Sequence, residues 1–271
     1  MAFDSAVEVL TARDIPHNLA LSNSVGWPDT DSEWRVIAEA ALVLGVKREG
    51  QLIGQGALGL FEDAASIAKM VVAPSAQRNG VGAQILDALL AEAERRSLRR
   101  VGLVATPAGR PLYESRGFTP VGEVAILVGT PTFRGEPPSS EAIAALEPVL
   151  ALERRFTGSA RTAMLRGRLQ RANASAIGAA GFALASGQPS GSRVGPIFAD
   201  DEETARALLR DLCLRAPGPV RLDVPGEQVA FRAWLRELGL VEKGFHLEMS
   251  RGGALPWQVP QRFCLATQAW G

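Results

Sequence analysis

A glycine-containing turn between a predicted strand and a predicted helix is the first feature of this chain that could do chemistry. The strand runs to Val72, and the turn that follows includes Gln77-Arg78-Asn79-Gly80-Val81-Gly82. Such a turn directs several main-chain N–H groups to one point in front of the positive end of a helix, where a diphosphate can bind. Gly80 and Gly82 can take positive φ and let phosphates approach, because they have no Cβ, and Arg78 adds a cation.

Three motifs contain turns of this kind. A Walker loop needs a lysine after its last glycine, and none is present here. A dinucleotide-binding fingerprint needs a third small residue where Ile85 stands. The turn resembles the acyl-CoA loop of the GCN5-related N-acetyltransferase (GNAT) family, and an ordinary strand-to-helix turn is the alternative. The resemblance implies acetyl-CoA as cosubstrate, bound by Met70, Val71, Val72, Gln77, Arg78, Asn79, Gly80, Val81, Gly82 and Ala83.

A tyrosine downstream is the second chemical feature. The run Leu112-Tyr113-Glu114-Ser115-Arg116-Gly117-Phe118 resembles the family's Leu-Tyr-x-x-x-Gly-Phe segment. In relatives this tyrosine stands near the CoA sulfur as a general acid, so the resemblance implies a catalytic role for Tyr113. It is the only tyrosine in 271 residues. The alternative is an amphipathic ring packed at a helix edge.

The elements around these residues predict an α/β (α+β) fold with a mixed, mostly antiparallel sheet flanked by helices. Strands are expected at 6–10, 41–48, 51–61, 65–72, 99–106 and from 118 to 129, and helices at 14–24, from about 31, at 84–96 and at 108–117. This order matches the GNAT fold. We expect a catalytic domain at 1–130 and a linker at 131–140, where prolines, serines and threonines gather.

The second half, 141–271, resembles a degenerate copy of the first. Val220-Arg221-Leu222-Asp223 corresponds to Val101-Gly102-Leu103-Val104, and Leu235 stands where the first copy has Tyr113. Asp200-Asp201-Glu202-Glu203 replaces the glycine turn, and four carboxylates would repel a diphosphate while capping a helix well. The layout resembles bacterial tandem GNAT proteins of the YitH-like kind, which implies that the second domain encloses the acceptor site.

Composition narrows the class of partner. The 29 basic and 29 acidic residues balance, which argues against nucleic acid bound through phosphates. Cys213 and Cys264 lie far apart without a metal-ligand pattern, so no metal is expected. No apolar run approaches transmembrane length, and we expect a cytoplasmic, bacterial protein without a membrane partner. A homodimer is an open option.

The acceptor site and the general base are less defined. Trp27 and Trp34 could form an aromatic wall, although core packing is the expected role of at least one. The strand before the turn carries no carboxylate. The remaining candidates for the general base lie elsewhere. Glu62 and Asp63 precede the strand but are expected in a solvated turn, and His17 is a lone histidine on the first helix. Asp223 could face the amine or cap the next segment. Otherwise a water-mediated base, or an amine that arrives neutral, would serve.

The sequence therefore predicts an N-acetyltransferase that moves an acetyl group from acetyl-CoA directly to a primary amine of a small molecule. A non-catalytic acyl-CoA sensor or scaffold is the alternative from another class. Acetylation of a protein N-terminus or lysine is the third, disfavoured by a second domain over the acceptor site.

Overall fold

The first half of the chain contains each strand and helix that its sequence predicts. The structure, a computed structural model, describes residues 6–133 and 138–270. Up to residue 129 its elements are β1 (Val7–Leu10), η1 (Ala12–Asp14), α1 (Ile15–Ser24), α2 (Asp31–Ala40), β2 (Ala41–Arg48), β3 (Gln51–Leu60), β4 (Ala64–Val72), η2 (Pro74–Ala76), α3 (Val81–Arg95), β5 (Arg100–Ala105), α4 (Arg110–Glu114) and β6 (Thr119–Gly129). Helix α2 begins at Asp31 because the Thr30 side chain accepts from the N–H of Glu33 at 3.1 Å.

The second half repeats this order. Its elements are α5 (Leu146–Thr157), α6 (Thr162–Gln170), β7 (Ala172–Gly178), β8 (Gly181–Gln188), β9 (Gly191–Ala199), α7 (Glu202–Arg215), β10 (Val220–Pro225), α8 (Val229–Glu237), β11 (Val241–Arg251) and β12 (Arg262–Cys264). Sequence patterns do not predict β7, β8 or β12, because β7 and β8 are rich in alanine, serine and glycine, which favour strands weakly. The predicted linker at 131–140 lies partly outside the described residues, since 134–137 are not among them.

The two halves exchange their last strands. The described strands form one mixed sheet in the order β1-β2-β3-β4-β5-β11-β6-β10-β9-β8-β7, with β12 paired to β9. Strand β11 lies between β5 and β6, so a second-half strand is flanked by two first-half strands. Strand β6 in turn lies between β11 and β10. The sheet therefore continues without a break from one half into the other, and each half completes the other's hydrogen-bond ladder.

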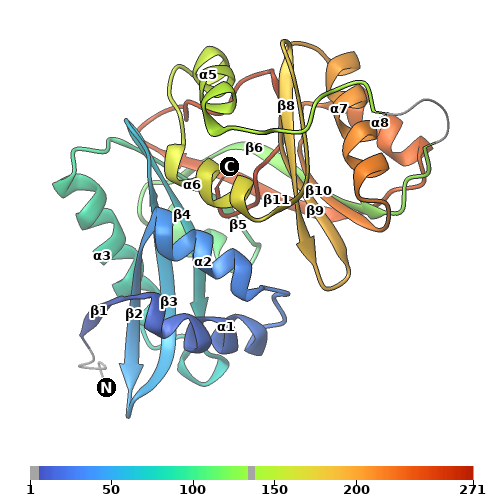
Figure 1. Ribbon diagram of the computed structural model, residues 1–271. Coiled ribbons are helices and arrows are strands. Elements are labelled where there is room, and N and C mark those ends of the chain that lie inside the picture. The colour runs from blue at the N-terminus through green and yellow to red at the C-terminus, as the bar shows by residue number, and fades with distance from the viewer. Residues whose placement is uncertain (1–5, 134–137, 271) are drawn as a thin grey trace.

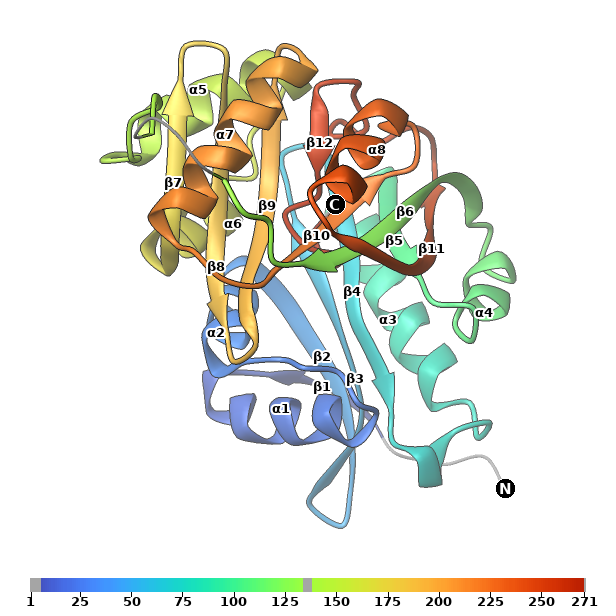
Figure 2. The same cartoon turned by 90° about the vertical axis from the view of Figure 1, so that its right-hand side faces the viewer.

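Helices cover both faces of this sheet. Figures 1 and 2 show α1 and α2 on one face of the first-half strands and α3 on the other. A buried cluster beneath α3 includes Ile85, Leu89 and Leu103. A second cluster joins the halves, because it contains both Trp34 of α2 and Trp270 near the C-terminus.

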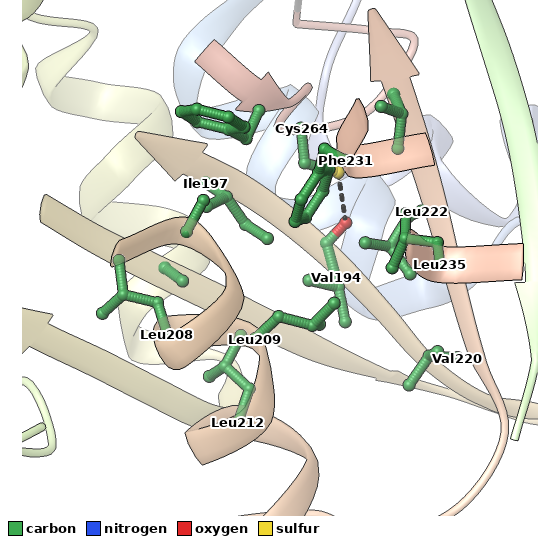
Figure 3. Packing of buried hydrophobic residues seen from close by; sticks show 14 of the residues in the cluster. Val194, Ile197, Leu208, Leu209, Leu212, Val220, Leu222, Phe231, Leu235 and Cys264 are labelled. Atoms are coloured by element: carbon green, nitrogen blue, oxygen red, sulfur yellow. Dashed lines mark hydrogen bonds between the residues drawn. The ribbon is translucent and has the colours of Figure 1, made fainter. Parts of the chain in front are cut away.

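The third cluster fills the second half. Figure 3 shows α7 residues such as Leu208 and Leu209 directed at Val194 and Ile197 of β9, with Cys264 nearby. The Cys264 thiol donates to the Val194 carbonyl at 3.3 Å. Helix α7 begins as predicted, since the Asp201 side chain accepts from the N–H of Thr204 at 2.8 Å. No helix in the described part of the chain is long and apolar enough to cross a membrane.

Candidate active site

The turn before α3 leaves main-chain N–H groups free of helical hydrogen bonds. Arg78 and Gly80 have φ values of +61° and +82°. Gly80 precedes the helix, and no side chain of the described residues caps it. The N–H of Gln84 donates to the Gly80 carbonyl at 2.9 Å, so the three N–H groups between them precede the first helical bond. This is the geometry that an anion site at a helix N-terminus needs.

Gly82 departs from expectation. A positive φ occurs at Gly80 but not at Gly82, which already lies in the first turn of α3. A Cβ at Gly82 would lie 3.4 Å from Cγ2 of Val72 and 3.6 Å from Cδ2 of Leu112, which are ordinary contact distances. The lack of a side chain at Gly82 therefore provides space in front of the helix rather than backbone freedom.

A bulge in β4 opens the sheet beside this turn. The register with β3 shifts between Gln55 and Ala57, and Lys69 has a φ of +53°. The parallel ladder between β4 and β5 ends at the pair Ile67 and Leu103. In the described part of the chain, the main chain of β4 after Ile67 is therefore left without a ladder on the β5 side.

A cavity of about 630 Å³ occupies this gap and continues toward the second half. Its first-half lining is Trp27, Pro28, Asp29, Glu33, Ile67, Ala68, Lys69, Met70, Val72, Gln77, Arg78, Gly80, Gly82, Ala83, Val104, Thr106, Ala108, Gly109, Leu112, Tyr113 and Ile126. Its second-half lining is Arg193, Arg221, His246, Thr267, Gln268 and Ala269. One cavity thus joins the helix N-terminus, the β4 gap and a wall that the second half supplies.

Most of the predicted cosubstrate-binding residues line this cavity, namely Met70, Val72, Gln77, Arg78, Gly80, Gly82 and Ala83. Val71 and Val81 do not line it: both are buried, at 4% and 1% exposed, and Val81 packs into the core beneath α3. Asn79 is exposed and also lies outside the lining. The side chain of Gln77 donates to the Val72 carbonyl at 3.1 Å, which ties the turn to the end of β4.

Tyr113 lies at the edge of the cavity near the end of α4. Its ring packs edge-on against Phe118, with centroids 6.0 Å apart. A Cβ added to Gly109 would lie 3.0 Å from Cε2 of Tyr113, so the ring rests on a residue without a side chain. Burial raises the pKa of Tyr113 well above its usual value, which keeps the phenol protonated.

Three charged side chains that sequence reasoning did not assign to the site meet at the β4 bulge. The Lys69 ammonium lies 2.5 Å from Oδ1 of Asp29 and 3.4 Å from Oε1 of Glu33. All three side chains are under one-tenth exposed, at 9%, 5% and 6%. Oδ2 of Asp29 and Oε2 of Glu33 are buried without a hydrogen-bond partner among the described residues. Asp29, Glu33 and Lys69 all line the cavity, so its wall is charged at this point.

Glu33 is held as a carboxylate. Burial by itself would raise the pKa of Glu33, but the positive charges of Lys69, Arg193 and Arg168 outweigh burial and lower the pKa to about 2. A carboxylate stabilised in this way is a weak proton acceptor near neutral pH.

The two tryptophans proposed for the acceptor site lie in different environments. Trp27 lines the cavity. Trp34 is fully buried in the cluster that joins the halves. Lys69 Nζ lies 6.0 Å from each of the two rings.

Asp223 lies behind the cavity wall instead of lining it. Its carboxylate accepts from Arg193 at 3.3 Å, from Arg221 at 2.9 Å and from Gln268 at 3.2 Å. It is 2% exposed. Its role in the structure is to hold three side chains that do line the cavity, and it does not cap the following helix.

The other predicted base candidates also lie outside the cavity lining. Glu62 lies 3.6 Å from Arg154, and Asp63 pairs with Arg100, so both belong to the solvated turn expected of them. His17 is exposed on α1. The chain's other histidine, His246, lines the cavity.

The equivalent gap in the second half is filled by the chain itself. The parallel ladder between β9 and β10 ends at Val194 and Leu222, and β12 pairs with β9 beyond that point. The N–H of Leu265 donates to the Asp223 carbonyl at 2.9 Å, which joins the same segment to β10. The main chain around β12 therefore occupies the place that stays open between β4 and β5.

Sequence reasoning missed Asp29, Glu33, Lys69, Arg193, Arg221, His246 and Gln268. A signal was present for two of them, since Lys69 is one of three lysines and His246 one of two histidines. The others lie in ordinary polar contexts, and only the fold gathers them. Among the described residues no group of three or more His, Cys, Asp or Glu side chains could hold a metal ion.

The fold and the cavity define an acyl-CoA-dependent transferase with two related halves. Residues 29–131 and 149–262 each match the acetyltransferase (GNAT) domain, and the chain belongs to the GNAT family of N-acetyltransferases. It is 27% identical over 245 residues to the uncharacterized N-acetyltransferase YitH of Bacillus subtilis, covering 84% of this chain and 83% of that protein.

Solved structures show the same architecture. A putative acetyltransferase from Pyrococcus horikoshii superimposes with a TM-score of 0.86 at 19% identity, covering 100% of this chain and 98% of that one. A tandem GNAT protein from the clavulanic acid biosynthesis pathway superimposes with a TM-score of 0.66 at 16% identity, covering 93% and 99%. These likenesses show that the fold extends over the whole chain.

Proposed function

We propose that the protein transfers the acetyl group of acetyl-CoA directly to a primary amine of a small molecule, with Tyr113 as general acid. The observation that carries the proposal is the continuous cavity, which joins the α3 N-terminus to the ring of Tyr113 and to two buried carboxylates. The thioester supplies an activated acetyl group. Binding of the cosubstrate, enclosure of the acceptor and proton transfer are left to residues of this chain.

The first half would bind the cosubstrate. The uncapped N–H groups at the start of α3, with Arg78, suit its diphosphate, and the free edge of β4 suits the amides of its pantetheine arm. The N–H of Ala73 donates to the Ile53 carbonyl at 2.9 Å on the β3 side. Main-chain groups of successive strand residues point to opposite sides, so the N–H of Val72 faces the gap. This alternation makes the N–H of Val72, rather than that of Val71, the donor to the oxyanion that develops during transfer.

The second half would enclose the acceptor and bind no cosubstrate. Segment 261–265 fills its strand gap, and carboxylates replace its glycine turn. A small acceptor is supported by the residues of both halves that line the cavity. An amine is supported by the carboxylates of Asp29 and Glu33 in the cavity lining, whose negative charge favours an amine-bearing acceptor.

Direct transfer places two requirements on the side chain of Tyr113. Its hydroxyl must be protonated near neutral pH, which burial ensures, and it must reach the sulfur as the C–S bond breaks. The phenol then donates its proton to the departing thiolate while the amine nitrogen bonds to the acetyl carbon.

The test is turnover with a panel of amines that includes diamines, amino acids, aminoglycosides and a lysine-containing peptide. Free thiol and acetylated product are measured together, and acetyl-CoA binding is measured by calorimetry. We expect turnover of a small amine, one acetyl-CoA per chain, and a fall of about 10- to 1000-fold in kcat for Tyr113→Phe at unchanged affinity. Binding without turnover of any amine would indicate a non-catalytic acyl-CoA protein, and preference for the peptide would contradict the small-molecule acceptor.

A further inference from the structure

The imidazole of His246 is held in a defined orientation at the cavity. His246 lies on β11, the exchanged strand, and Nδ1 is 2.8 Å from Oε1 of Gln268. Both residues line the cavity that also contains Tyr113. The histidine is therefore brought to the first half's site by the second half's last strand.

The side-chain amide of Gln268 has one favourable orientation, which Asp223 determines. Nε2 of Gln268 lies 3.2 Å from Oδ1 of Asp223. An ionised carboxylate only accepts hydrogen bonds, so the NH₂ group of Gln268 must face it. The carbonyl oxygen of Gln268 then faces His246 and can only accept.

The tautomer of the neutral imidazole follows from this chain of hydrogen bonds. Nδ1 of His246 must carry the hydrogen that Oε1 of Gln268 accepts. The lone pair is then on Nε2. Asp223 and Gln268 act as positioning residues, which orient the ring without touching the reacting atoms.

The proposed transfer needs a proton acceptor. The carboxylates that line the cavity are poorly suited to this role. Asp29 and Glu33 are engaged by Lys69, and Glu33 is stabilised as a carboxylate by the surrounding cations. Imidazole is the side chain whose charge changes between roughly pH 5 and 8, which suits a general base.

We infer that His246 is the general base of the transfer, a role that rests on the proposed function above. Nε2 takes the proton that the amine nitrogen loses as the new N–C bond forms. The C–S bond breaks at the same time, and Tyr113 gives its proton to the sulfur. The imidazolium then returns its proton to solvent, and the phenol regains one.

The charged and titratable groups around the cavity come from every neighbouring element. They are Asp29 and Glu33 from the α2 region, Lys69 from β4, Arg78 from the turn, Tyr113 from α4, Arg193 from β9, Arg221 from β10 and, behind the wall, Asp223. A pH profile assigned to His246 must therefore be compared with a variant that lacks only this imidazole.

The matched pair of variants is His246→Ala and His17→Ala, since His17 is exposed and outside the cavity. With the best acceptor of the amine panel, we expect His246→Ala to lower kcat/KM at pH 7 at least tenfold. The variant should lose the plateau of the wild-type profile, so that its rate rises with pH up to the pKa of the amine. Added imidazole should restore part of the rate, and His17→Ala should behave as wild type. An unchanged rate and profile for His246→Ala would overturn the inference.

A second measurement does not depend on turnover. Nitrogen-15 NMR of the free protein reports the tautomer of each histidine, and His17→Ala assigns the two signals. We expect hydrogen on Nδ1 of neutral His246, and a mixture of tautomers in Gln268→Ala. Hydrogen on Nε2 in the wild-type protein would overturn the inference even if the enzyme is active. Failure of the wild-type protein to acetylate any amine would overturn the proposed function, and the base role would fall with it.

Discussion

The ammonium of Lys69 lies 2.5 Å from Oδ1 of Asp29, at the point where β4 bulges and leaves its neighbour. The backbone of Lys69 is left-handed at the bulge, with a φ of +53°, and its side chain reaches Asp29 and Glu33 in the α2 region. The bulge beside the gap between β4 and β5 therefore also supplies the counter-ion for the acidic wall of the cavity.

Glu33 should make the free energy of unfolding depend on pH in the acidic range. Its pKa is about 2 in the fold, against 4.5 for an ordinary glutamate. Its charge therefore stabilises the fold fully above pH 4.5, and this contribution is lost as the pH falls toward 2. The contribution is on the order of 3 kcal/mol at about 1.4 kcal/mol per pKa unit. Between pH 6 and 3 we expect a smaller fall in the free energy of unfolding for Glu33→Gln than for the wild type, measured by urea unfolding. Glu62→Gln is the exposed control, and equal falls in all three proteins would contradict the prediction.

Asp29→Asn should weaken acceptor binding more than chemistry. The substitution removes the negative charge of a side chain that lines the cavity and pairs with Lys69. We expect KM for a diamine to rise about tenfold, which corresponds to about 1.4 kcal/mol, with little change in kcat. The affinity for acetyl-CoA measured by calorimetry should stay the same. A KM equal to that of the wild type would show that the acceptor does not contact Asp29.

Gly109→Ala should displace the ring of Tyr113. The added methyl group would lie 3.0 Å from Cε2 of that ring, closer than ordinary contact. We expect kcat to fall about tenfold while CoA affinity stays constant, since a small displacement of a catalytic group is costly. Gly178→Ala, whose methyl group would meet no atom within 4 Å, should retain full activity. Full activity in Gly109→Ala would mean that the position of the ring matters little.

Gly82→Val should separate binding from folding. A Cβ at Gly82 has ordinary contacts to Val72 and Leu112, so the fold should tolerate it, while the branched side chain occupies the approach to the α3 N-terminus. We expect CoA affinity to fall more than tenfold and the melting temperature to change by only a few degrees. Gly178→Val controls for a β-branched residue elsewhere. Wild-type affinity in Gly82→Val would place the cosubstrate elsewhere.

The halves should not fold apart. Residues 1–130 produced alone lack β11, so β5 and β6 would lose the strand that lies between them. Such unpaired edges favour aggregation. We expect the isolated half to be insoluble, and co-expression with residues 131–271 to yield a soluble complex that binds CoA. A soluble, monomeric first half with native CoA affinity would contradict this expectation.

The sequence by itself determined the local features of this protein. The turn at 77–82, the strand before it and the helix with Tyr113 are encoded in short windows, where glycine, proline and apolar periodicity act on neighbouring residues. Replacement of the second copy's glycine turn by Asp200–Glu203 was also visible there.

Only the tertiary structure decided which strands pair and which side chains meet. The exchange of β6 and β11 pairs strands that lie more than 100 residues apart in the chain. The filling of the second gap likewise depends on non-local pairing, between segment 261–265 and strands β9 and β10. Lys69, Asp29 and His246 come from a bulge, a loop and an exchanged strand. No local pattern brings them together, because their proximity results from the packing of the whole sheet.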